Sequence, residues 1–181
     1  SNALSLKGIL DLTVPSGGNS GKGIHLYADQ SISDLSIYGI GVANNGGGSD
    51  GEEFTFPSIS VSAGEDIMIY RDSSAYASYF ASCFSEFEIL VAGNSTINQN
   101  GDDAIELFEN GQLIETFGDV NVDGTGQSWE YLDSWAFKDS SVWIYGGINC
   151  SDGSDSTQVS NCIYPICPPN LCIDTYAIDT L

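Results

Sequence analysis

Short apolar runs alternate with clusters of small polar residues along most of the chain. Ile, Val, Tyr, Phe and Thr are grouped in the runs, and Gly, Ser, Asn and Asp separate them, as in β proteins. No segment shows a sustained helical period with capping residues. The pattern predicts ten strands, which are Leu6–Val14, Gly23–Tyr27, Leu35–Val42, Glu53–Phe56, Ile67–Tyr70, Phe87–Val91, Ala104–Glu109, Gln112–Phe117, Ser134–Lys138 and Val142–Ile144.

The clearest turn signal is Asn110-Gly111, between the strands expected at Ala104–Glu109 and Gln112–Phe117. Asn-Gly favours a type I′ hairpin turn, which needs positive φ at both central residues. Many short strands joined by regular turns are typical of a β-sandwich or a β-barrel. We expect a core that contains Ile37, Ile67, Ile69, Phe87, Ile89, Leu107, Ile114 and Phe117.

The composition changes at Cys150. Residues Gly153–Ser160 are polar, and prolines interrupt the segment that follows. We therefore expect the β domain to cover residues 4–149, and residues 150–181 to form a disulfide-tied extension that leads into a linker or a next domain. Residues 1–3 have the sequence of an expression scar and are excluded from the fold argument.

The charge balance limits the partners. The chain has 25 acidic and 4 basic side chains, for a formal net charge of −21. Nucleic-acid binding requires basic residues that displace counterions from phosphates, so we expect no nucleic-acid partner. No apolar run is long enough to span a bilayer, so no membrane insertion is expected. The acidic surface suits a cation such as calcium, or serves solubility alone.

The cysteines indicate disulfides. Four of the five follow residue 149, and the only histidine, His25, is far from them, which disfavours a zinc site. The loop between Cys150 and Cys162 is polar and contains glycine, so we predict a disulfide between these two residues. Cys83 and Cys167 are a second candidate pair, although the sequence alone leaves other pairings open. Disulfides imply an oxidising, extracytoplasmic compartment.

Four segments, in order, resemble the lamin-tail domain: Asp34–Tyr38, Ala63–Ile69, Asn100–Leu107 and Gly126–Lys138. The last is similar to bacterial secreted versions of the family. The resemblance implies an immunoglobulin-like, antiparallel β-sandwich in a secreted, multidomain protein. The nuclear relatives bind DNA or chromatin through basic surfaces, and this acidic chain departs from them there.

One loop matches a calcium motif. Residues 119–130 fit D-x-[DN]-x-[DN]-G-x₅-E at every constrained position. The ligands would be the side chains of Asp119, Asn121, Asp123 and Glu130 and the carbonyl of Thr125, because calcium prefers six to eight oxygens. The flanks are expected to be strands rather than helices, so the alternative is a polar turn in which Asp and Asn cap backbone amides. The same alternative is favoured for Asp102 and Asp103.

Trp129, Tyr131, Trp135 and Phe137 alternate along one segment. Trp129, Tyr131 and Trp135 are a possible ligand surface, for example for sugars. The favoured alternative is that these aromatic side chains fill the space between the two sheets, since alternate residues of a strand face one side. His25 is expected to be an ordinary strand residue, because a lone histidine carries no spacing information.

No arrangement of nucleophile, base and acid stands out, so we expect no enzyme. The leading hypothesis is a monomeric, noncatalytic interaction or structural module of a secreted or cell-surface bacterial protein, stabilised by calcium. Its partners would be neighbouring domains of a larger chain, another protein or a polysaccharide. The alternative is a carbohydrate-binding module of a secreted hydrolase.

Overall fold

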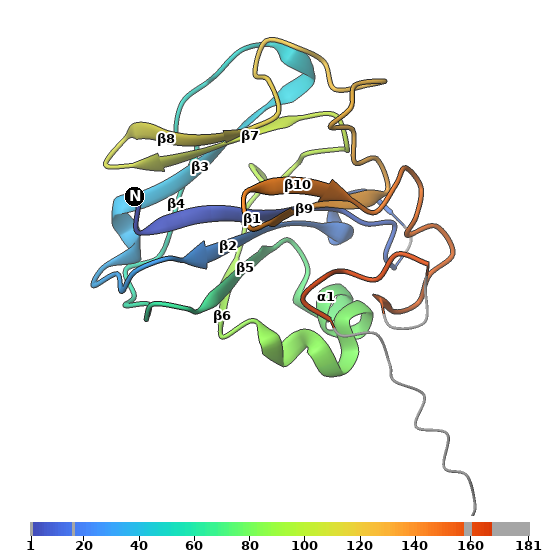
Figure 1. Ribbon diagram of the computed structural model, residues 1–181, viewed down its shortest axis with the longest axis horizontal. Helices are drawn as coiled ribbons and strands as arrows, with labels where there is room; N and C mark the ends of the chain where they lie inside the picture. The colour runs from blue at the N-terminus through green and yellow to red at the C-terminus, as the bar shows by residue number, and fades with distance from the viewer. Residues whose placement is uncertain (1, 16, 158–160, 168–181) are drawn as a thin grey trace, which may run out of the picture.

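The computed structural model of the protein describes residues 2–15, 17–157 and 161–167. Cys172 and the end of the expected extension lie outside these residues. Two β-sheets pack face to face, and a short helix lies against the far side of one of them (Figure 1). The strands are β1 Leu4–Asp11, β2 Lys22–Ala28, β3 Tyr38–Ala43, β4 Phe54–Thr55, β5 Asp66–Tyr70, β6 Ile89–Ala92, β7 Ala104–Glu109, β8 Gln112–Phe117, β9 Ser134–Asp139 and β10 Val142–Tyr145.

The all-β sandwich is confirmed. Strands β7 and β8 have the predicted bounds, and the turn residues Asn110 and Gly111 have φ of 51° and 72°, as a type I′ turn requires. The first strand begins earlier than predicted and ends at Asp11. Residues Leu35–Ile37 form a 3₁₀ turn, η2, because the Asp34 side chain accepts a hydrogen bond from the Ser36 amide.

The sheets have six strands in the order β10-β9-β1-β2-β5-β6 and four in the order β4-β3-β7-β8. The prediction of a wholly antiparallel sandwich is wrong at one edge, where β6 runs parallel to β5. A parallel pair needs a crossover connection. Here the crossover contains the helix α1, Ser73–Phe80, and the 3₁₀ segment η4, Ala81–Glu86.

Helix α1 was not expected from the sequence. The Asp72 side chain caps it by accepting hydrogen bonds from the amides of Ser74 and Ala75, at 2.9 and 3.1 Å. A helix this short is marginal on its own and depends on tertiary packing. Its buried side chains recur one turn apart; they are Ala75, Tyr76, Tyr79 and Phe80.

The six-stranded sheet has a buried core on each face. Ile24 and Leu26 of β2 point between the two sheets, whereas His25 between them points to the other face, as the period of two in a strand dictates. On that outer face, α1, η4 and residues 161–167 cover a second core. The red end of the described chain lies beside α1 in Figure 1. The molecule therefore has three layers.

Most of the predicted core is buried. Ile67, Ile69, Leu107 and Phe117 belong to the core between the sheets, and Phe87 to the outer core. Ile89 and Ile114 are partly buried against the first core. The prediction for Ile37 is wrong: the residue is 37% exposed, because it belongs to the 3₁₀ turn and not to β3.

Two disulfides attach the third layer. The predicted pair Cys150–Cys162 is present, with a Cα–Cα distance of 5.0 Å, and Cys83 pairs with Cys167 at 5.4 Å. The second pair joins η4 to residues 161–167. None of the helices in the described part of the chain has the length and apolar character that crossing a membrane requires.

Candidate functional site

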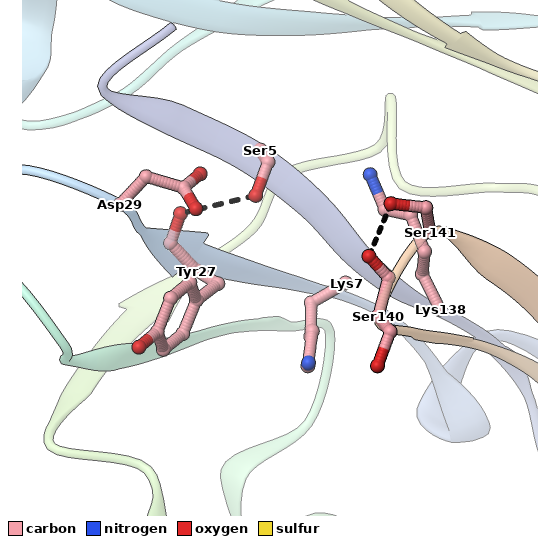
Figure 2. Close-up of a pocket in the computed structure, with 7 residues that line it drawn as sticks. All are labelled: Ser5, Lys7, Tyr27, Asp29, Lys138, Ser140 and Ser141. Atoms are coloured by element: carbon pink, nitrogen blue, oxygen red, sulfur yellow. Dashed lines mark hydrogen bonds between the residues drawn. The ribbon is translucent and has the colours of Figure 1, made fainter. Parts of the chain in front are cut away.

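A polar pocket of about 370 Å³ lies at one end of the six-stranded sheet (Figure 2). Strand β1 contributes Ser5 and Lys7, and β2 contributes Tyr27, with Asp29 just beyond its end. The hairpin between β9 and β10 contributes the rest of the lining, which is Lys138, Ser140 and Ser141. Three neighbouring segments at one end of the sheet therefore shape the pocket.

A β-bulge directs Lys7 into this pocket. Leu6 pairs with Leu26 and Gly8 with His25, so Lys7 is an extra residue in β1. Bulges of this kind redirect a side chain locally. The Lys7 ammonium lies 4.9 Å from the ring centre of Phe137 and 5.5 Å from that of Tyr27. These cation–π contacts hold the ammonium on the outer face without neutralising its charge.

The other described cations have polar partners. Lys22 pairs with Asp11 at 3.0 Å, and Lys138 pairs with Glu115 of β8. Arg71 donates from Nη1 to the carbonyl of Ile97 at 2.9 Å. Among the described residues, Lys7 is thus the cation without a hydrogen bond or ion pair. Figure 2 shows its ammonium pointing to the same side as the Ser140 hydroxyl, whereas that of Lys138 points to the opposite side.

The hydroxyl groups of the pocket make only local contacts. Ser5 Oγ donates to the Tyr27 carbonyl at 3.5 Å, and Ser140 Oγ donates to Asp139 Oδ1 at 3.2 Å. Ser141 Oγ donates to the Ser140 carbonyl. A hydroxyl that donates one hydrogen bond still has two acceptor lone pairs. The pocket therefore offers a cation, hydroxyl oxygens and the Asp29 carboxylate to a ligand.

His25 is buried in the outer core rather than placed in a cleft. Its Nδ1 lies 2.9 Å from the Tyr164 hydroxyl, and its Nε2 lies 2.6 Å from Asp66 Oδ1. The ring of Phe87 packs edge-on against it, with 5.1 Å between ring centres. Gly8 makes room for this arrangement, since a Cβ there would lie 1.8 Å from the Tyr164 hydroxyl oxygen.

The surroundings assign the charge and tautomer of His25. Burial lowers its pKa from the usual 6.5, and the hydrogen bond to Asp66 opposes that effect without cancelling it. The ring is therefore neutral near pH 7. Nε2–H donates to the Asp66 carboxylate, and Nδ1 accepts the proton of the Tyr164 hydroxyl. The histidine thus fastens residues 161–167 to the sheet.

The loop matching the calcium motif forms a series of capped turns. Asp119 accepts a hydrogen bond from the amide of Asn121, and Asp123 from that of Thr125, each at 2.9 Å. Glu130 accepts from the amide of Gly126 at 2.7 Å. The described residues include no group of three or more His, Cys, Asp or Glu arranged to hold a metal. In this arrangement the three side chains cap backbone amides, and calcium binding stays a prediction from the motif.

The motif glycine has a packing role in this loop. A Cβ on Gly124 would lie 2.5 Å from the Trp129 ring. Nearby, Asp103 accepts hydrogen bonds from the amides of Asn45 and Asn100, at 2.7 and 3.0 Å. Burial raises the pKa of Asp103, and these hydrogen bonds oppose that shift. Asp103 therefore caps a turn before β7, as the favoured alternative for this residue predicted.

The possible ligand surface of Trp129, Tyr131 and Trp135 is not formed, and these rings pack in the interior, as the favoured alternative predicted. Tyr131 is fully buried, Trp135 is 6% exposed and Trp129 is half-buried. The aromatics also do not share one face: Tyr131 packs in the core between the sheets, and Trp135 and Phe137 pack in the outer core. At Trp135 and Ala136 the two faces of the sheet are both covered, so alternation along β9 did not identify a surface.

Comparisons with protein-family models, with curated proteins and with solved structures find no match for this chain. The site and its function therefore rest on the residues described above.

Proposed function

We propose that this chain is a noncatalytic interaction module of a secreted or cell-surface bacterial protein. The observation that carries the proposal is the placement of its single histidine. His25 lies between Tyr164 and Asp66 with no exposed surface, where it holds the disulfide-tied layer on the sheet. A general base must reach the proton that it removes, and a ring enclosed in this way has no access to a substrate.

The two disulfides support the proposed compartment. Disulfides persist in oxidising environments such as the cell exterior and the bacterial periplasm. The resemblance to lamin-tail domains of bacterial secreted proteins agrees with this setting. In such a protein the module would bind, space or present neighbouring domains or an external partner, and a calcium ion in the 119–130 loop would add stability.

A second candidate function is carbohydrate binding, which the Figure 2 pocket supports in place of the buried aromatics. Its lining is rich in hydroxyl groups and carries the Lys7 ammonium on a rigid sheet. Concave sites with a few converging polar groups are the usual form of small-ligand sites.

The test is a turnover assay against glycoside, ester, peptide and phosphodiester substrates, run in parallel on the wild type and on His25→Gln. We expect both proteins to match the buffer blank. Turnover by the wild type that is lost in His25→Gln would contradict the noncatalytic proposal. Turnover that persists in the variant would also contradict the proposal, and would show that His25 is not required for that activity.

A further inference from the structure

The strongest unexplained feature of the molecule is the Lys7 ammonium. The chain has 25 acidic side chains, yet Lys7 makes no ion pair with any described residue. A bulge and two aromatic rings hold it in the lining of a pocket. A cation that is positioned but not neutralised is suited to an anion supplied from outside, since charge-assisted hydrogen bonds to ammonium groups are among the stronger ones.

The net charge limits that anion to a small one. At −21, the chain repels an extended polyanion, and Asp29 places a carboxylate within the same pocket. Repulsion by distant charges is screened over about 10 Å at 0.1 M salt, so a single carboxylate responds mainly to the nearest ammonium. The favoured ligand therefore carries one negative charge.

The rest of the lining favours hydroxyl groups on the ligand. Ser5, Ser140 and Ser141 present hydroxyl oxygens, and the Asp29 carboxylate accepts hydrogen bonds only. The pocket volume of about 370 Å³ is near the lower end of the range for small-molecule sites, about 300–1,000 Å³. One sugar ring with a carboxylate matches this combination of groups, whereas a peptide C-terminus offers a carboxylate without the hydroxyls.

We propose that the pocket binds a single uronic acid unit, with its carboxylate on Lys7 Nζ and its hydroxyls on Ser5, Ser140 and Asp29. This inference rests on the proposed interaction function and gives it a substrate class. The two aromatic rings are positioning residues: they hold the ammonium above the sheet and do not touch the ligand's charge.

The experiment is an NMR titration of the ¹⁵N-labelled protein with methyl β-glucuronide, whose blocked anomeric centre mimics a chain-linked unit. We expect the amide signals of Ser5, Lys7 and Ser140 to shift together. Methyl β-glucoside lacks the carboxylate, and acetyl-diglycine lacks the sugar hydroxyls. Each should bind roughly tenfold or more weakly, as expected for the loss of a charged or multiple hydrogen bond.

Two variants locate the site. Lys7→Met should weaken glucuronide binding roughly ten- to hundred-fold. Lys138→Met removes the same charge from a neighbouring lysine whose ammonium pairs with Glu115 and points to the side opposite that of Lys7, and it should change binding less than about threefold. The amide spectrum away from the pocket reports whether each variant is folded, and the three-ligand comparison on the wild type needs no variant.

Three results would overturn the proposal: no shifts with the glucuronide at its highest soluble concentration, equal binding of the glucoside, or equal binding of acetyl-diglycine. The last would identify a carboxylate site that does not recognise sugars. Release of methanol during the titration would instead contradict the noncatalytic function while leaving the binding site in place.

Discussion

At the scale of single residues, the ion pair of Asp11 and Lys22 is the most consequential polar contact inside the molecule. Both side chains are 8% exposed, and Lys22 also donates to the carbonyl of Gln99. The Gln99 amide donates to the carbonyls of Leu10 and Gly23, at 3.1 and 3.0 Å. Burial raises the pKa of Asp11, and the charge of Lys22 opposes that effect. These contacts fasten the loop before β7 to β1 and β2.

Removing the Lys22 side chain should therefore lower the free energy of unfolding far more than removing the Lys7 side chain does. Lys22→Met leaves the Asp11 carboxylate buried without its counter-ion, and we expect a loss of about 3–5 kcal/mol in the free energy of unfolding. Urea unfolding at pH 7 measures it. Lys7→Met is the matched control, and its cation–π contacts predict a loss of about 1 kcal/mol or less. Equal losses in the two variants would contradict the structural role of the pair.

At the scale of elements, residues 161–167 form the piece on which the third layer depends. Cys162 and Cys167 attach it covalently, and Tyr164 between them reaches the buried His25. The Cys162 carbonyl accepts hydrogen bonds from the indole of Trp135 at 3.3 Å and the hydroxyl of Tyr79 at 3.4 Å. Stability of this layer is thereby coupled to the charge state of one imidazole.

That coupling predicts how stability depends on pH. Because burial lowers the pKa of His25 in the folded state, the unfolded chain binds more protons just below pH 6.5. The free energy of unfolding is therefore not reduced by His25 above pH 6.5. Below that pH it falls, by at most about 1.4 kcal/mol per pH unit. Asp66, Tyr164, Lys7 and Glu88 are the charged or titratable groups around the ring.

Urea unfolding at several pH values between about 5 and 7.5 measures the effect. The difference between wild type and His25→Gln isolates the histidine from the carboxylates, which the two proteins have in common. A wild-type stability that rises as the pH falls through this window, relative to the variant, would contradict the buried neutral ring.

The loop of residues 119–130 is the second element with a testable role. If calcium binds here, the wild-type melting temperature should rise with calcium and fall with chelator. At a free concentration about one hundred times the dissociation constant, the gain is about 2.7 kcal/mol. Asp123→Ala should abolish the difference, because it removes a predicted ligand. An unchanged wild-type melt would leave only the capped turns, in which Asp123 accepts from Thr125.

At the scale of the whole molecule, the outer face of the six-stranded sheet has a covered part and an open part. The covered part lies under α1, η4 and residues 161–167 and forms the outer core. The open part carries the pocket of Figure 2. Phe137 links the two parts, since it packs in the outer core and its ring contacts the Lys7 ammonium of the pocket. The covered part supplies rigidity to the part that is left open.

The disulfides should contribute unequally to the stability of this assembly. Cys83–Cys167 closes 84 residues and Cys150–Cys162 closes 12. Restriction of the unfolded chain predicts about 4.5 kcal/mol for the first and about 3 kcal/mol for the second. Double Cys→Ser variants compared by urea unfolding measure both. Peptide mapping without reductant checks the pairing, and finding Cys150 as a free thiol would contradict it.

The sequence reveals local structure better than it reveals the site. Apolar runs and the Asn110-Gly111 turn signal were enough to predict most of the strands. The short polar loop between Cys150 and Cys162 was enough to predict their disulfide. Helix α1 was missed because its eight residues depend on packing, although the Asp72 cap and the spacing of Tyr76 and Phe80 are visible in hindsight.

Long-range contacts explain why the site could not be predicted. The role of His25 depends on Tyr164, which lies 139 residues away along the chain. Lys7 reaches its pocket through a bulge that strand periodicity does not predict. Alternation correctly divides β9 into two faces, but only the third layer shows that the face with Trp135 is covered.

The measurement that tests the central claim most directly is a pH titration of the His25 ring nitrogens by ¹⁵N NMR. A structural, noncatalytic histidine should be neutral at pH 7, with its proton on Nε2, and should titrate only below its usual 6.5, because burial lowers its pKa. A ring that is protonated at pH 7, or that carries its proton on Nδ1 and titrates at or above 6.5, would contradict this account.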